Sequence, residues 1–214
     1  MNNTAEKKTD NKITKARKGN LQQILSAAED IFAKNGYKGT TVSSIANAVG
    51  LPKANVLYYF KSKEKLYQEV MNQLLSLWMQ HMNEITADSH PKDALPKYIK
   101  NKIKQSQNHP NASRIFAAEV LHGAHFLRTS LQQELKDQFQ QTCQVFQAWI
   151  DKKWIDPIHP EHLLFMLWSS TQAYADHGLQ ISILMDKEEL TETDFEHGIT
   201  AVTQVILKGC GVKT

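Results

Sequence analysis

The sequence has few of the residues and segments that secreted, membrane-bound or catalytic proteins depend on. Only two of its 214 residues are cysteines. Cys143 and Cys210 form neither a CxxC motif nor a disulfide framework. No apolar run approaches the roughly 20 residues of a membrane span, and the lysine-rich beginning lacks the apolar segment of a signal peptide. These absences predict a soluble protein of a reducing, cytoplasmic compartment, with no membrane partner.

Motifs of catalysis are also missing from the chain. It has no glycine-rich phosphate loop, nucleophile elbow or paired-carboxylate motif, so we expect no enzymatic activity and no cofactor. Nine histidines raise the question of a metal. Glu119, His122 and His125 are spaced at i, i+3 and i+6, but Gly123 interrupts the rigid helix face that they would need. We therefore expect no metal site.

Positive charge is concentrated at the beginning of the chain. Residues 1–65 hold twelve basic and five acidic side chains, whereas the remaining residues hold thirteen basic and seventeen acidic ones. The net charge of +3 thus conceals a basic front third on a mildly acidic body. This asymmetry favours a module that binds a polyanion, joined to a part that does not.

Apolar residues recur with the period of an α-helix along almost the whole chain. Between Leu21 and Phe32 they follow i, i+3, i+4, i+7 spacing, and no segment alternates as a strand would. We expect an all-α protein with a flexible basic arm at 1–19, a three-helix module at 20–66 and a larger helical body at 67–214. The helices expected from residue 63 onward are 63–87, 92–107, 110–121, 125–129, 131–153, 160–185 and 192–208.

The segment 40–65 is the most informative part of the sequence. Thr41 can cap a short helix, Gly50 can supply a sharp turn, and Pro52 suits the first turn of a second short helix. Leu57 and Phe60 are expected to face inward. This layout is typical of a helix-turn-helix, whose second helix lies in the major groove of DNA.

Side chains on and around the helix expected at 52–59 are the candidate DNA contacts. Lysine can reach guanine or phosphate, asparagine can bond adenine, and tyrosine hydroxyls favour phosphate oxygens. Threonines at a helix start and a lysine on the other flank can hold phosphates, while basic residues before the first helix can enter a minor groove. The candidates are Arg17, Lys18, Thr40, Thr41, Lys53, Asn55, Tyr58, Tyr59 and Lys63.

These residues also carry a resemblance to a known family. The stretches 37–41, 45–50 and 57–66 are similar to the DNA-binding part of TetR-family (tetracycline-repressor-type) transcriptional regulators. The resemblance implies a homodimeric repressor that binds a palindromic operator in double-stranded DNA. It also implies that a small-molecule effector, held in the C-terminal body, releases the DNA.

Parts of the body extend this resemblance. The stretches 108–116 and 165–176 and the segment around Trp78 resemble pyrimidine-responsive repressors of the same family, which implies uracil or thymine as the effector. A planar ring with N–H and C=O groups needs an aromatic face and an amide. Trp168 and Gln172 share a helix face at i, i+4. The ligand-binding candidates are Trp78, Trp168, Thr171, Gln172 and Tyr174.

Small residues in the helix expected at 160–185 predict the surface where two copies meet. Four small residues would allow a partner helix to approach closely: Ser169, Ser170, Ala173 and Ala175. The helix expected at 131–153 could contribute the apolar residues Leu135, Phe139, Val145 and Phe146. Two alternatives remain open: a TetR-type regulator that responds to a different hydrophobic ligand, and a DNA-binding structural protein without an effector.

Overall fold

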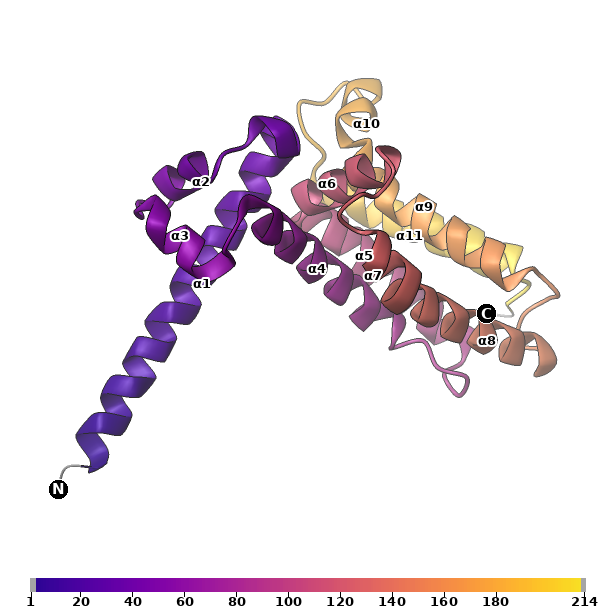
Figure 1. Cartoon of the computed structure of the whole chain (residues 1–214). Coiled ribbons are helices and arrows are strands. Elements are labelled where there is room, and N and C mark those ends of the chain that lie inside the picture. Colours follow the sequence, from indigo (N-terminus) through magenta and orange to yellow (C-terminus); the bar gives the residue numbers. More distant parts are fainter. Residues whose placement is uncertain (1–2, 213–214) are drawn as a thin grey trace. The chain divides into compact units, whose positions relative to one another are not determined.

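The computed structural model describes the backbone of residues 3–212 and the side chains of residues 17–212. Within this range the secondary structure is helical and contains no strand (Figure 1), which confirms the all-α expectation. The chain divides into two compact units, Met1–Met71 and Asn72–Thr214. The division falls within helix α4, Lys63–Met82, which therefore contributes residues to both units.

The first unit contains α1 (Asn3–Gly39), α2 (Val42–Ala48), α3 (Lys53–Phe60) and the first half of α4. Helix α1 already begins at Asn3, so residues 3–19 are helical where the sequence predicts a flexible arm. Residues 1–2 of that arm lie outside the described range.

Turns between these helices are set by a few residues with special backbone or capping roles. Gly36 has a φ of 67° and interrupts the regular helical backbone of α1, as expected of a glycine at a helix end. Thr41 caps α2, because its hydroxyl accepts a hydrogen bond from the Ser44 amide at 3.0 Å. Gly50, with a φ of 66°, makes the turn into α3.

The second unit is built from longer helices. Its elements after α4 are α5 (Pro91–Asn108), α6 (Pro110–Leu121), α7 (Arg128–Ser130), the π-helical turn η1 (Leu131–Leu135), α8 (Lys136–Asp151), α9 (Pro160–Asp176), α10 (Gly178–Leu184) and α11 (Glu192–Gly209). Prolines open α5, α6 and α9, where the missing amide proton costs no hydrogen bond. Helices α5, α9 and α11 pack side by side and form the middle of the unit.

Three expected helix boundaries are wrong. Helix α4 ends at Met82 instead of about residue 87, and the piece expected at 125–129 is replaced by the one turn of α7. The helix expected at 160–185 ends at Asp176, before the separate α10.

Side chains of α6 bind the end of α9: Ser113 donates to the Asp176 carboxylate at 2.7 Å, and Arg114 donates to the Ala175 carbonyl at 3.1 Å.

The core of the second unit is dominated by large apolar side chains. Trp149 and Phe146 of α8 are fully buried. The Trp149 indole N–H also donates to the Thr86 carbonyl oxygen at 3.2 Å, which ties α8 to the loop after α4. Among the described residues, no helix is both long and apolar enough to cross a membrane.

Candidate nucleic-acid interface and ligand cavity

Helix α3 presents a polar face made of side chains that are one turn apart. Asn55, Tyr58 and Tyr59 lie at i, i+3 and i+4, away from the buried Val56 and Phe60. Asn55 is exposed, Tyr58 is 62% exposed and Tyr59 is half-buried. The face therefore carries an amide and two phenols on a helix of the size that enters a major groove.

Leu57 faces the interior less completely than the sequence predicts. Val56 is the buried aliphatic residue of α3, with 1% of its surface exposed, whereas Leu57 is half-buried. Val56 and Phe60 anchor the short helix in the module. Because these two side chains face inward, Asn55 faces outward.

Cations gather at the edge of this polar face. The guanidinium carbon of Arg17, on α1, lies 5.9 Å from the centre of the Tyr58 ring, and the Lys61 ammonium lies 5.4 Å from it. Lys18 and Lys53 are also exposed. Cations beside an exposed phenol suit the phosphate backbone of DNA. Lys61 is absent from the sequence-based candidates, although its place directly after the aromatic cluster could have indicated it.

Two candidates are engaged inside the module instead of pointing to solvent. Thr40 is buried, and its hydroxyl donates to the Gly36 carbonyl oxygen at 2.8 Å. The Lys63 ammonium donates to the carbonyl oxygens of Tyr37 at 2.8 Å and Thr40 at 3.0 Å. Both side chains thus hold the turn after α1, where phosphate contacts were expected. Thr41 stays exposed while it caps α2.

A small cavity in the second unit brings three ligand-binding candidates together. It is lined by Trp78 and Met82 of α4, Tyr98 and Lys102 of α5, Leu135 of η1, and Trp168 and Gln172 of α9. Its free space is about 30 Å³, which is room for about two water molecules. A ring-sized ligand therefore has to widen it.

The chemistry of this lining combines aromatic faces with hydrogen-bonding groups. Trp78 is held edge-to-face against Phe116, with ring centres 4.6 Å apart. The Tyr98 hydroxyl is buried and has no hydrogen bond of ordinary geometry to a described residue. Burial raises the pKa of Tyr98, and the nearby Trp168 side chain opposes that rise. The site can stack a flat ring and offer it polar partners.

Thr171 and Tyr174 do not line the cavity. Thr171 is fully buried: its hydroxyl donates to the Leu167 carbonyl at 2.7 Å, and its own carbonyl accepts from Ser106 at 3.0 Å. Tyr174 packs against Phe195 of α11. Both residues face other helices although they are near Gln172 in sequence, and their role in ligand binding stays a prediction.

Sequence reasoning missed Tyr98 and Lys102 of α5. Both lie among the buried residues of that helix, alongside Leu95, Ile99 and Ile103. A lysine within an apolar helical stripe is the signal that could have found the site, since lysine is almost never fully buried without a reason.

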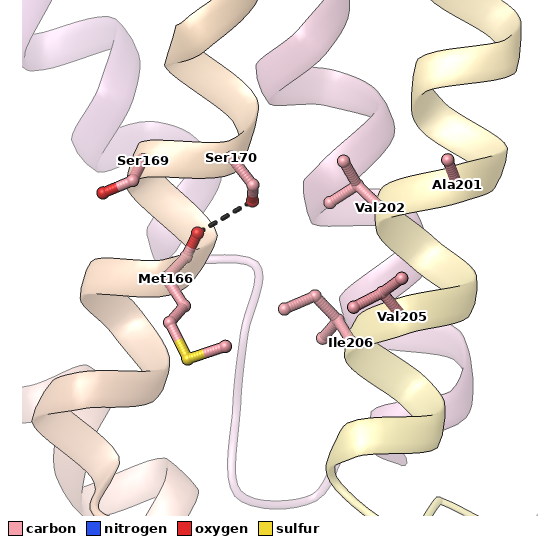
Figure 2. A pocket seen from close by; sticks show the side chains of 7 residues that line it. All are labelled: Met166, Ser169, Ser170, Ala201, Val202, Val205 and Ile206. Atoms are coloured by element: carbon pink, nitrogen blue, oxygen red, sulfur yellow. Dashed lines mark hydrogen bonds between the residues drawn. The ribbon is translucent and has the colours of Figure 1, made fainter.

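A second and larger hollow lies between α9 and α11. Its free space is about 400 Å³, and Figure 2 shows the lining side chains of the two helices on either side of it. The lining consists of Met166, Ser169, Ser170, Ala201, Val202, Val205 and Ile206. The Ser169 and Ser170 hydroxyls donate to carbonyls of their own helix at 2.8 Å. The groove is therefore almost wholly apolar and suits a partner's side chains better than a polar ligand.

Other residues of the expected dimer surface lie elsewhere. Phe146 is fully buried in the core, and Leu135 lines the small cavity. Met166 and Val205 are instead exposed by 52% and 65%.

Among the described residues, no group of three histidine, cysteine or acidic side chains is placed to hold a metal ion.

Comparison with known proteins agrees with this division of the chain. Residues 24–70 match the family described as bacterial regulatory proteins, tetR family. Residues 71–213 match the family described as YcdC-like protein, C-terminal region. The two matched regions meet within α4, close to the boundary between the compact units.

Relatives of known name match either nearly the whole chain or its first part. The HTH-type transcriptional regulator RutR of Escherichia coli strain K12 is 36% identical over 202 residues, which is 94% of this chain and 95% of that protein. The regulator QacR of Staphylococcus aureus is 40% identical over 58 residues, covering 27% of this chain and 31% of that protein.

Solved structures show the same fold. A bacterial regulatory protein of the tetR family from Rhodococcus RHA1 has a TM-score of 0.72 at 16% identity, covering 91% of this chain and 98% of that one. The ketosteroid transcriptional regulator KstR2 of Mycobacterium tuberculosis has a TM-score of 0.68 at 16% identity, with 91% and 96% covered. The chain belongs to the TetR family of DNA-binding transcriptional regulators.

Proposed function

We propose that the protein is a homodimeric repressor whose hold on a palindromic operator is released by a pyrimidine such as uracil or thymine. The observation that carries this proposal is the cavity in which Trp78, Trp168 and Gln172 converge. It offers aromatic faces and an amide with both a donor and an acceptor, as a pyrimidine requires. The resemblance of these segments to pyrimidine-responsive repressors supports the same choice.

Helix α4 connects this cavity to DNA binding through the covalent chain. It carries Trp78 near one end, and it begins at Lys63, whose ammonium binds the turn after α1. The cavity is too small for a ring in its present form. A ligand seated against Trp78 would displace α4 and so change the distance between the two α3 helices of a dimer. The affinity for an operator with fixed half-site spacing would then fall.

We propose that α3 is the reading helix, with Asn55 and Lys53 directed to base edges. Tyr58, Tyr59, Thr41, Lys61, Arg17 and Lys18 are the proposed backbone contacts. Asparagine can bond adenine bidentately, whereas phenols and cations near Tyr58 favour phosphate oxygens.

Replacing Asn55 with alanine should weaken operator binding by about 1–3 kcal/mol and relax the preference at one base position. The exposed amide has little role in the fold, so the loss should come from base reading. Fluorescence anisotropy with the operator and single-base variants of it measures both effects. Asn83→Ala, which removes an exposed amide outside the first unit, is the control. An equal loss on every sequence would assign Asn55 to the phosphate backbone instead.

Replacing Gln172 with alanine should abolish the rise in melting temperature that uracil or thymine causes, while operator binding without ligand is retained. Gln172 lines the cavity, and a ligand with unpaired N–H and C=O groups would lose its amide partner. Thermal unfolding with and without ligand measures the change, and Gln180→Ala on the exposed surface of α10 is the control. An undiminished ligand effect in Gln172→Ala would place the effector elsewhere.

Electrophoretic mobility shifts test the whole proposal. DNA from upstream of the protein's own gene should be bound more tightly than random duplex, and uracil or thymine should release it. Binding without sequence preference or ligand response would favour the structural DNA-binding alternative. Release by a larger hydrophobic compound alone would favour a TetR-type regulator with a different effector.

A further inference from the structure

Lys102 is a buried cation without a counterion. Its side chain is 3% exposed and lines the small cavity on α5. Within the described part of the chain, its ammonium makes no hydrogen bond or ion pair, and lies 4.1 Å from the centre of the Trp78 ring. The ring face compensates only part of the hydration that the charge has lost.

The charged and titratable groups around Lys102 do not neutralise it. Asp176 at the end of α9 acts on Lys102 from a distance, and its carboxylate already accepts a hydrogen bond from Ser113. His81 of α4 interacts electrostatically with Lys102; its buried Nδ1 has no hydrogen-bond partner among the described residues, and burial lowers its pKa. Tyr98 of α5 is held neutral by burial.

Loss of hydration is the main influence on the pKa of Lys102. Burial lowers its pKa to about 7, against a smaller opposing effect of Asp176. A ligand atom that carries negative charge would reverse this balance, because a charge-assisted hydrogen bond to a buried ammonium is among the strongest available. The Tyr98 hydroxyl, which has no hydrogen bond of ordinary geometry to a described residue, lies in the same lining and can donate to the same ligand atom.

We propose that Lys102 is the specificity-determining residue of this cavity, selecting flat ring ligands that present an oxygen bearing negative charge. The inference rests on the proposed function of the cavity as the effector site, and it names the feature of the effector that the cavity selects. It ranks an ionised cyclic imide above a neutral one of the same size. Binding then draws a proton onto Lys102, so that the complex holds an ammonium against the ligand oxygen.

The test compares uracil with barbiturate, the same ring with a third carbonyl, which is an anion at neutral pH. Isothermal calorimetry on the full-length protein should give a barbiturate affinity about tenfold higher than that for uracil. Lys102→Met should remove this preference, and Lys102→Gln should do the same while keeping a polar group. In wild type, titrations in buffers of different ionisation enthalpy should show proton uptake that both variants lack.

Each outcome has a distinct meaning. If barbiturate binds and uracil does not, the assignment of Lys102 stands and uracil is removed as the effector. If both variants keep the wild-type preference for barbiturate, Lys102 is not the selecting residue, although the cavity remains the effector site. If wild type binds neither ring, both the cavity assignment and the role of Lys102 are overturned.

Discussion

Replacing Val205 with arginine should convert the proposed dimer into a monomer and lower operator affinity by about 10²–10⁴-fold. Val205 is 65% exposed and lines the apolar groove between α9 and α11, which we propose is covered by the second copy. An arginine there would place an unpaired charge in the interface. A monomer then binds each half-site independently and loses the gain from linking two reading helices.

Sedimentation velocity and operator titration measure the two effects of Val205→Arg. Thr200→Arg introduces the same side chain at an exposed position on the other side of α11, and should leave both mass and affinity unchanged. If Val205→Arg stays dimeric, the second copy does not cover this groove, and the interface has to be sought on another surface.

Replacing Lys102 with methionine should stabilise the protein most at and below neutral pH, by an amount on the order of a few kcal/mol. The folded pKa of Lys102 is about 7, whereas the ordinary value is 10.5. Between these values the unfolded chain binds more protons than the folded one, so the stability of wild type rises with pH. Below pH 7 both states are protonated and the full penalty of the buried charge remains. The advantage of Lys102→Met should therefore shrink as pH rises from about 7 to about 10.

Urea denaturation at several pH values measures this difference. Burial raises the pKa values of Cys143 and Cys210 to about 11, which lowers stability above the normal thiol pKa, but equally in both proteins. Lys100→Met, an exposed change on the same helix, should give no pH-dependent difference. A constant difference between wild type and Lys102→Met would show that Lys102 keeps an ordinary pKa.

The helix-turn-helix was predictable because its determinants are local. Thr41, Gly50 and Pro52 act on backbone groups within a few residues, and the structure uses Thr41 as the cap and Gly50 as the turn. The sequence did not show which polar side chains are exposed to solvent and which form hydrogen bonds within the fold. Lys63 was expected to contact phosphate, but its partners are carbonyls 23 and 26 residues away in the sequence.

The cavity was predictable only in part. Trp168 and Gln172 share a face because they are four residues apart on α9, and the structure places both in the lining. Thr171 and Tyr174 belong to other faces, which pack on α5 and α11. Lys102 joins the site from α5, and no spacing within α9 could have identified it.

The amino-acid sequence by itself determined the all-α architecture, the basic reading module and the position of its turn, because helical periodicity, capping and glycine conformation depend on neighbouring residues. Only the tertiary structure decided which polar groups stay exposed, which are engaged within the fold, and that a lysine is enclosed with two tryptophans. These properties depend on contacts between helices that are distant in sequence. The desolvation cost of a buried charge arises only when those helices pack around it.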